Sequence, residues 1–435
     1  MKLKTNLMYS SLLLGANLIS QISVTWYAAY YAPSSGNGFI SVSLAGYAML
    51  IARIIDAVAD IPVAYWSDNA TFKSGRRMPF IKYGALPMII CFILMWFPIA
   101  GGSIMTNFVY ITAVMSGFVF LYTLVVAPYL ALLPEIAETP DERIKITTYQ
   151  SVFTVIALLL GTTVAGLIIN SYGYRTMGVV MGLVALPFTL LPVFAIKEKQ
   201  HQKTGDEPDL FRSIWLTLKN KNYLFFQITN LLVSFVTNML IIAFPFIGGV
   251  LLGLSAAGSG LLLGATMLVA VASFPLIVRA TNRYGKKRVY GASILLMGVM
   301  LGLLFFVGRP LLFFDQPWFG YTLLILSGVP MSSMLIMPNA FVADITDEDA
   351  AKTGQRREAM YYGVAGLLTA AFIGVSSWYT LSILFNYFGY NAGSPLGIYL
   401  IAPSSLIICV IAYAVLKKGY RLDEREVIEL KKDKS

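Results

Sequence analysis

The chain has 435 residues, of which 57% are hydrophobic and 12% are charged, and its mean hydropathy is +0.72. This composition excludes an ordinary soluble globular protein and indicates a polytopic membrane protein. The formal net charge of +10 requires no nucleic-acid partner, because Lys and Arg cluster in short loops beside apolar segments, where positive-inside topology explains them.

Apolar segments of bilayer-crossing length recur along the chain and predict an all-α membrane protein with twelve transmembrane helices. They lie near residues 7–31, 40–66, 80–100, 106–133, 146–170, 175–196, 223–250, 256–279, 288–308, 318–343, 359–389 and 395–416. With both termini placed in the cytoplasm, the outer loops carry almost no Lys or Arg beyond Arg175 and Arg309. The charge bias therefore predicts a multi-pass protein of the plasma membrane, the inner membrane of a bacterium, with both termini inside.

The connection at residues 198–222 is the longest and most polar in the chain, and it divides the predicted helices into two bundles of six. We expect an N-terminal bundle at 1–197, a C-terminal bundle at 223–418 and a cytoplasmic tail at 419–435. A parallel repeat with a site between its halves is typical of carriers that open alternately to either side. The connection itself predicts a short amphipathic helix, whose apolar face is Leu210, Phe211, Ile214, Trp215 and Leu218.

The second predicted span carries Arg53, Asp56 and Asp60 deep inside an apolar segment, spaced so that they share one helix face. Helical rise places Asp56 about 15 Å from the basic loop that follows, near the middle of a bilayer core about 30 Å thick. An ionised carboxylate there costs at least ~2.5 kcal/mol, so it must be paired, hydrated or bound to a cation. One interpretation is a structural Arg–Asp pair that locks helices together. The other, favoured by two carboxylates against one Arg, is an ion or proton site.

Several classes of protein lack their signature residues in this sequence. The sequence contains no G-x-x-x-x-G-K-[ST] loop, the motif that binds the phosphates of ATP in ATP-driven proteins. The only histidine, His201, lies in the central connection, which leaves no His-based zinc or nucleophilic site in the spans. Charge rings or filter loops of a channel are not visible either. The sequence therefore predicts a secondary transporter that is not an enzyme and needs no cofactor besides a coupling ion.

Three groups of residues carry a family resemblance. They are Arg53, Asp56, Asp60, Gly75 and Pro79; Pro128, Tyr129, Ala131, Leu132, Pro134 and Glu135 with Asp141, Glu142 and Arg143; and Asp344, Asp347, Lys352, Gly354, Arg356, Arg357 and Glu358. In this order they resemble the glycoside/pentoside/hexuronide:cation symporters, the melibiose-carrier-like family of the major facilitator superfamily. The resemblance implies that Asp56, Asp60 and Thr123 bind the coupling cation, Na⁺ or H⁺, with Arg53 as their charge partner. Carboxylate and hydroxyl oxygens are the hard ligands that Na⁺ prefers.

The sequence departs from the family pattern at several positions. Ala59 stands where the melibiose carrier has an asparagine, which removes one oxygen ligand and makes H⁺ more plausible as the coupling ion. Asn17 and Val126 stand where the family has sugar-binding aspartates, Gln150 replaces an arginine and Ala370 a lysine. The charged solute contacts are therefore neutralised, and a galactoside such as melibiose is not assumed.

Polar and aromatic residues on the apolar spans are the candidates for solute contacts, because a sugar needs hydrogen bonds to its hydroxyls and flat apolar faces for its ring. The predicted contacts are Asn17, Gln21, Tyr27, Tyr122, Gln150, Gln227 and Asn230. The alternative for each is a structural role, because Asn and Gln in membrane spans also join helices and Tyr also anchors span ends.

Charged residues at the cytoplasmic ends of the spans predict a gate that closes the inner mouth. They are Arg76, Arg77, Glu135, Asp141, Arg143, Asp344, Asp347 and Arg357. We expect bases such as Arg77 and Lys286 to pair with these acids in one state of the carrier. The alternative is that the basic residues do no more than set the topology.

The leading hypothesis is a cation-coupled symporter of a sugar or glycoside that works by alternating access. Its expected partners are the solute and the lipid bilayer, with no nucleic acid, and we expect a monomer. The alternatives are a carrier of an amphiphile such as a lysophospholipid, favoured by the neutralised pocket, and a membrane sensor without transport activity.

Overall fold

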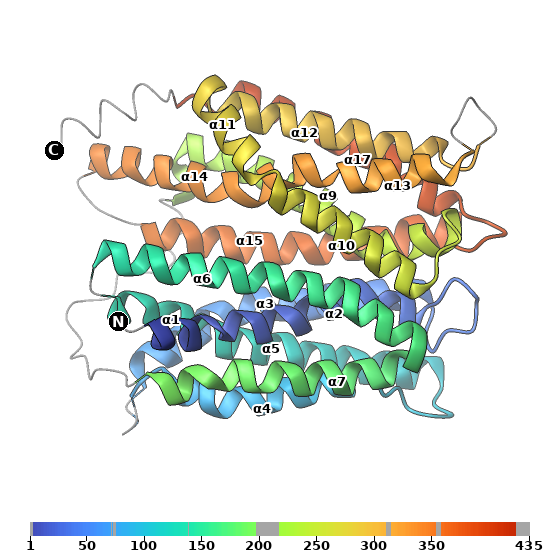
Figure 1. The fold of residues 1–435 in the computed structure, drawn as a ribbon, viewed down its shortest axis with the longest axis horizontal. Coiled ribbons are helices and arrows are strands. Elements are labelled where there is room, and N and C mark those ends of the chain that lie inside the picture. Colours follow the sequence, from blue (N-terminus) through green and yellow to red (C-terminus); the bar gives the residue numbers. More distant parts are fainter. Residues whose placement is uncertain are drawn as a thin grey trace. The chain divides into compact units, whose positions relative to one another are not determined.

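The computed structural model describes residues 3–70, 72, 75–137, 139–196, 217–309, 315–353 and 358–422 (Figure 1). Helices make up nearly all of this described part, which contains no strand beyond a single bridge between Asn391 and Ser394. The prediction of an all-α protein is confirmed. The predicted amphipathic helix lies almost wholly outside the described residues.

The first half of the chain forms α-helices, three of which begin at side-chain caps. They are α1 (Leu3–Ser10), α2 (Leu12–Tyr31), α3 (Val42–Asn69), α4 (Met78–Leu94), α5 (Ile104–Ile136), α6 (Pro140–Leu159), the π-helical turn η1 (Leu160–Val164) and α7 (Ala165–Ala195). The side chains of Ser41, Ser103 and Thr139 each accept a hydrogen bond from the backbone N–H three residues later. Such caps satisfy N–H groups that the first turn leaves unpaired.

The second half repeats this pattern with more interruptions. It contains α9 (Lys221–Phe246), the π turn η2 (Ile247–Leu251), α10 (Ala256–Ala272), α11 (Phe274–Tyr284), α12 (Lys286–Leu303), the 3₁₀ turn η3 (Leu304–Phe306), α13 (Pro317–Leu326), α14 (Gly328–Thr353), α15 (Glu358–Trp378), the π turn η4 (Tyr379–Phe385), α16 (Asn386–Phe388) and α17 (Leu396–Gly419). Helices α10 and α11 meet at a bend of 41°.

Nine described helical runs are long and apolar enough to cross a membrane, and the bent pair α10 and α11 supplies a tenth. One of the nine, Glu142–Ala195, has 54 residues. A helix of that length measures about 80 Å, more than twice a bilayer core. The run breaks at Gly173, where φ is +82°, so it supplies two spans. With the shorter apolar helix α4, the described chain is consistent with the predicted twelve.

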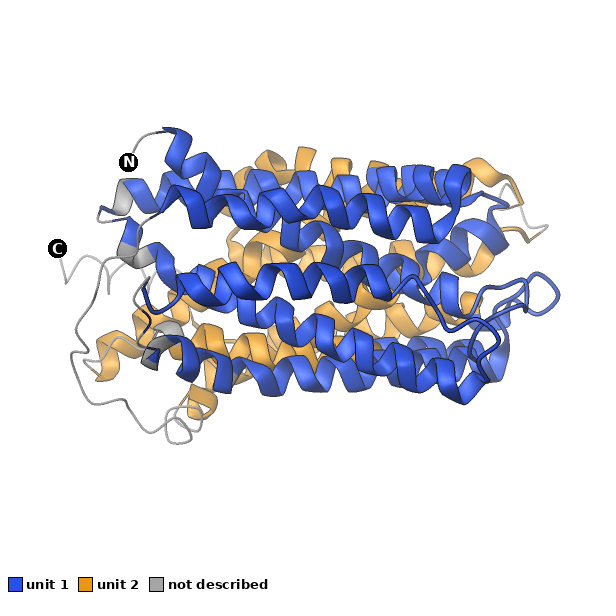
Figure 2. Cartoon of the chain, turned by 90° about the horizontal axis from the view of Figure 1, so that it is seen from below, with its two compact units in different colours: residues 1–203, 241–264, 377–397 blue, residues 204–240, 265–376, 398–435 orange. Residues whose placement is uncertain are grey.

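The described chain divides into two compact units, coloured separately in Figure 2. Unit 1 comprises Met1–Lys203, Ile241–Gly264 and Ser377–Gly397, and unit 2 comprises Thr204–Leu240, Ala265–Ser376 and Ile398–Ser435. These units do not follow the predicted boundary at 198–222. The reason is that two segments of the second half, 241–264 and 377–397, make their contacts with helices of the first half.

Within unit 1, α3 and α4 pack on α5, and α2 packs on α6 and α7. The contact between α3 and η4, which we call the α3–η4 seam, is especially close. Ser382 Oγ donates to the Ser43 carbonyl at 2.8 Å, and a Cβ added at Gly46 would lie 2.3 Å from Ser382 Oγ. Only glycine permits this approach, as is typical of helix packing in membranes. Large apolar side chains such as Phe194, which is 80% exposed, point outward, where lipid would cover them.

Candidate functional site

Helix α3 brings two of the predicted charged residues into direct contact. Arg53 Nη1 lies 3.0 Å from Asp56 Oδ2, and the two side chains are 15% and 13% exposed. The pairing predicted from their i, i+3 spacing is therefore present. Arg53 Nε is also buried and makes no hydrogen bond within the described chain.

A hydroxyl from α5 engages the other oxygen of the same carboxylate. Thr123 Oγ1 donates to Asp56 Oδ1 at 2.8 Å, and the threonine is buried. Asp56 therefore has one partner on its own helix and one on the neighbouring helix. Such charge-assisted hydrogen bonds are stronger than neutral ones, so they fix the position of the Asp56 carboxylate between α3 and α5.

The next residue on α5 extends the network toward α2 and α6. Tyr122 OH donates to Asn17 Oδ1 at 2.9 Å, and Asn17 Nδ2 donates to Thr154 Oγ1 at 3.0 Å. Sequence reasoning predicted Tyr122 and Asn17 but missed Thr154, although Thr154 follows Gln150 at the i+4 spacing that marks a shared helix face. Adjacent residues of α5 thus connect the predicted cation ligands with two predicted solute contacts.

A small cavity of about 20 Å³ lies beside this network. Its lining includes Ser20, Ser23, Arg53, Asp56, Phe118 and Tyr122. A cavity of this volume holds one water-sized species. Among the described residues, no cluster of three or more His, Cys, Asp or Glu is present that would hold a multivalent metal ion. The carboxylate and hydroxyl oxygens of the network instead suit a proton or a small monovalent cation.

Asp60 differs from Asp56 in its surroundings. It is half-buried and makes no hydrogen bond or ion pair with any other described residue. A carboxylate at this depth in a membrane span requires compensation by a proton, a cation or water. The two predicted cation carboxylates therefore differ in their hydrogen bonding. Asp56 is bonded to Arg53 and Thr123, whereas Asp60 has no bonded partner among the described residues.

The structure gives three of the predicted solute contacts other partners within unit 1. The Tyr27 ring is fully buried and its hydroxyl donates to the Ala45 carbonyl at 3.3 Å. Gln150 is buried and donates to Tyr129 OH at 2.7 Å, and Gln21 donates to Thr25 on its own helix at 3.0 Å. Tyr27 and Gln150 are buried and join helices in this state, and their role as solute contacts stays a prediction.

Two predicted solute contacts on α9 belong to unit 2. Gln227 is buried, and its Nε2 donates to the Ala365 carbonyl at 3.5 Å. Its Oε1 is also buried and has no hydrogen-bond partner in the described part of the chain. Asn230 is half-buried and likewise makes no hydrogen bond with the residues that the structure describes. These groups retain hydrogen-bonding capacity that a ligand or water would use.

The predicted gate residues are only partly described. In unit 1, buried Arg77 donates to the Ala131 carbonyl at 2.6 Å, and Arg143 donates to the Ala137 carbonyl at 3.1 Å. In unit 2, Lys286 Nζ lies 2.5 Å from Asp344 Oδ2. Arg76 and Asp347 are half-buried. The side chains of Glu135 and Asp141, and all of Arg357, lie outside the described residues. The expected pairing of Lys286 with Asp344 is therefore present, and its role in gating stays a prediction.

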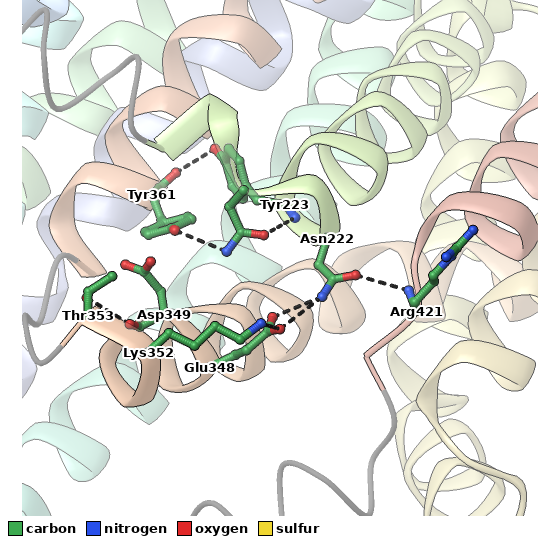
Figure 3. Close-up of polar contacts among 9 residues, drawn as sticks. Asn222, Tyr223, Glu348, Asp349, Lys352, Thr353, Tyr361 and Arg421 are labelled. Carbon is green, nitrogen blue, oxygen red and sulfur yellow. Dashed lines mark hydrogen bonds and ion pairs between the residues drawn. The ribbon is translucent and has the colours of Figure 1, made fainter.

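A second polar cluster, missed from the sequence, ties four segments of unit 2 together (Figure 3). Buried Glu348 accepts hydrogen bonds from Asn222 Nδ2 at 3.0 and 3.2 Å and from Lys352 Nζ. Asn222 Oδ1 accepts from the Arg421 backbone N–H at 3.1 Å, and Tyr223 OH donates to the Tyr361 backbone carbonyl at 2.8 Å. The i, i+4 spacing of Glu348 and Lys352 was the available signal. The cluster joins the start of α9 to α14, to the start of α15 and to the residues after α17.

Comparison with known proteins agrees with this architecture. The family model described as MFS/sugar transport protein matches residues 8–416. The chain is 23% identical over 349 residues to the glucuronide carrier protein homolog of Escherichia coli (strain K12), covering 77% of this chain and 73% of that protein. It is 22% identical over 389 residues to the sodium-dependent lysophosphatidylcholine symporter 1-A of Danio rerio, covering 79% and 71%. The crystal structure of a D-xylose-proton symporter shares the fold, with a TM-score of 0.67 at 16% identity over 96% of this chain and 97% of the other.

Proposed function

The chain belongs to the MFS/sugar transport family of membrane proteins, and we propose that it is a cation-coupled symporter of a sugar or glycoside. The observation that carries this proposal is the Asp56 network. A carboxylate in a membrane span is bonded to Arg53 and Thr123, and the residue beside Thr123 is bonded to Asn17. The relative described as a glucuronide carrier homolog supports a sugar derivative as the solute.

The proposed cation site consists of Asp56, Asp60 and Thr123. A proton or Na⁺ that arrives at Asp56 competes with Arg53 for the carboxylate oxygens, the Thr123 hydroxyl turns its oxygen to the cation, and Asp60 supplies a negative charge that no described residue compensates. Binding of the cation therefore relieves an unfavourable charge within a membrane span. This relief is the free energy that would favour the loaded carrier.

Coupling to the solute would pass through α5. When the cation draws Thr123 toward itself, the adjacent Tyr122 moves with the same helix turn, and the Tyr122–Asn17 hydrogen bond is strengthened or broken. If Asn17 and Tyr122 also bind solute hydroxyls, each ligand changes the affinity for the other by the same factor. In unit 2, the unpaired Gln227 Oε1 and Asn230 are the proposed solute contacts.

A second candidate solute is an amphiphile. The similarity to a lysophosphatidylcholine symporter of Danio rerio favours it, as does the replacement of charged sugar-binding residues by Asn17, Val126 and Gln150. The same cation site would drive either solute. The two candidates differ only in which labelled compound accumulates.

Uptake by membrane vesicles tests the proposal directly. Vesicles carrying the protein would be supplied with labelled sugars, glycosides, uronides and lysophospholipids under an imposed Na⁺ gradient or pH gradient. We expect gradient-driven accumulation of a sugar or glycoside. Accumulation of lysophospholipids alone would establish the second candidate, and no gradient-driven uptake of any compound would overturn both.

Variants at the two carboxylates test the cation site. Asp56→Asn and Asp60→Asn are each expected to abolish accumulation against a gradient while leaving part of the solute exchange, because Asn cannot carry the charge that the cation compensates. Asp315→Asn, at an exposed carboxylate between α12 and α13, is the matched control and is expected to behave like the parent. Full accumulation in the double Asp56→Asn/Asp60→Asn variant would remove the coupling assignment.

A further inference from the structure

Unit 1 contains a cavity of about 420 Å³ that the proposed cation site does not use. It lies between the loop that precedes α3 and the loop that follows α16, and we call it the loop cavity. Its lining includes Gly38, Ser41, Phe385, Asn386, Tyr390 and Asn391. The volume falls within the range of small-molecule sites. By the predicted topology both loops lie on the outer face of the membrane.

One wall of the loop cavity is aromatic. The rings of Phe385 and Tyr390 are stacked, with centroids 5.7 Å apart and an interplanar angle of 7°. Phe246 meets both rings edge-on, at 5.0 and 5.8 Å between centroids. Burial raises the pKa of Tyr390 above its ordinary value, so its phenol keeps its proton and remains a hydrogen-bond donor. The wall therefore combines a flat apolar surface with a hydroxyl.

The polar groups of the loop cavity are neutral and have capacity for further hydrogen bonds. Asn386 is exposed and makes no hydrogen bond with the described residues. Asn391 uses its carbonyl to accept from the Ser394 N–H at 2.8 Å, which leaves its NH₂ group. Ser41 Oγ accepts from the Leu44 N–H at 3.3 Å, which leaves its O–H to donate. No charged side chain lines the cavity among the residues described, so it suits a neutral polyhydroxyl ligand rather than a phosphate or a carboxylate.

Backbone hydrogen bonds hold both walls in place without a ligand. The Gly389 N–H donates to the Phe385 carbonyl at 2.9 Å, and the Gly389 carbonyl accepts from the Gly397 N–H at 2.9 Å. Gly389 has φ +84°, a conformation that other residues adopt only with strain. On the opposite wall, the Phe39 N–H donates to the Tyr31 carbonyl at 2.9 Å. A ligand would therefore spend little binding free energy on ordering these loops.

The loop cavity adjoins the α3–η4 seam. Ser382, whose hydroxyl reaches the Ser43 carbonyl, lies one helical turn before the cavity residue Phe385, and Ser43 follows the cavity residue Ser41 by two positions. Opening of the seam would move both walls of the cavity at once. A ligand bound in the loop cavity would therefore lie next to the seam when it opens.

We propose that the loop cavity is a binding subsite for a neutral pyranoside, which is held at the outer mouth by the Tyr390 ring, with buried Phe385 stacked behind it, and by Asn386, Asn391 and Ser41. That the bound ligand is also the transported solute rests on the proposed function. Binding itself is independent of that function, because no residue of the loop cavity belongs to the cation site.

Protection of an introduced cysteine tests this subsite. Ile104 lines the cavity, is 57% exposed and contributes none of the proposed polar or aromatic contacts. Ile104→Cys, in a Cys91→Ala/Cys409→Ala background, would be labelled on intact cells with a membrane-impermeant maleimide. The probes are neutral 4-nitrophenyl glucoside, galactoside and xyloside. We expect labelling from outside, slowed several-fold by at least one probe and still slowed in the Asp56→Asn/Asp60→Asn double variant.

Substitutions in the cavity separate a built site from a passive recess. Tyr390→Ala and Asn386→Ala are each expected to remove the protection. Should Tyr390→Ala prove unstable, Asn386→Ala still tests the subsite, because it alters only an exposed side chain. Tyr387→Ala is the matched control, because Tyr387 lies on α16, is 74% exposed and does not line the cavity. It should keep the protection.

The outcomes distinguish this proposal from the proposed function. If a probe is taken up by vesicles but never slows the labelling, or slows it equally in Asn386→Ala, the subsite is refuted while transport stands. Labelling of Ile104→Cys only from the cytoplasmic side would also refute it. Protection without uptake of any sugar would support the subsite and count against the proposed function.

Discussion

The close approach of Gly46 to Ser382 yields a quantitative prediction about the α3–η4 seam. In Gly46→Ala, the new Cβ would lie 2.3 Å from Ser382 Oγ and 3.2 Å from both the Ser382 nitrogen and Leu381 Cβ. Non-bonded atoms do not approach to 2.3 Å, so either the Ser382 hydroxyl gives up its hydrogen bond to the Ser43 carbonyl or α3 and η4 move apart. Overpacking of this kind costs about 1–3 kcal/mol. The cost applies only while the seam is closed, so the ratio of open to closed seam should rise by about 5- to 150-fold.

Accessibility of a seam residue measures this ratio. Leu381 is fully buried in the closed seam, so Leu381→Cys, with the native cysteines replaced, should react with an impermeant maleimide only when the seam opens. Adding Gly46→Ala is expected to raise the labelling rate by the factor above. Gly117→Ala is the matched control, because a Cβ there would meet only Cys91 Sγ at 3.6 Å, an ordinary contact that the cysteine replacement also removes.

A second substitution tests whether the clash between the Cβ added at Gly46 and Ser382 Oγ causes the faster labelling. Ser382→Ala removes the oxygen that the new Cβ would meet, so the Gly46→Ala/Ser382→Ala pair should label more slowly than Gly46→Ala alone. Residues in contact are expected to show such non-additivity. Equal labelling of Gly46→Ala and its parent, in protein that is correctly folded, would refute the argument that this contact limits opening.

Two further predictions concern the polar contacts. Thr123→Val removes the hydroxyl that binds the cation in the proposed site, and because such a contact with a charged group contributes about 1.5–3 kcal/mol, half-maximal uptake should need about 10- to 150-fold more cation. Thr123→Ser keeps the hydroxyl and should stay near the parent, and equal cation dependence of the Val variant would contradict the assignment. Lys286→Met removes the Lys286 partner of buried Asp344, which should lower the free energy of unfolding by about 3 kcal/mol and with it the Tm in detergent. Lys286→Met/Asp344→Asn should recover part of that loss, and no recovery would indicate that the pair is not what stabilises this end of unit 2.

The sequence by itself determined the class of protein and the character of α3. Apolar segments of membrane-crossing length required helices, because a lipid core offers no water to satisfy backbone N–H and C=O groups. The i, i+3 spacing required that Arg53 and Asp56 share a face, and the structure has them in contact at 3.0 Å. These properties follow from local geometry, which depends on residues a few positions apart.

Only the tertiary structure decided which polar residues are engaged by the protein itself. Tyr27, Gln150 and Asn17 all have partners on neighbouring helices, which are Ala45, Tyr129 and Tyr122 in that order. The sequence does not specify the rotation of those helices. The α3–η4 seam joins Ser43 to Ser382, which are separated by 339 positions. Contacts of that range, and with them the loop cavity, arise from how whole helices pack, because helical periodicity defines a face without defining what that face meets.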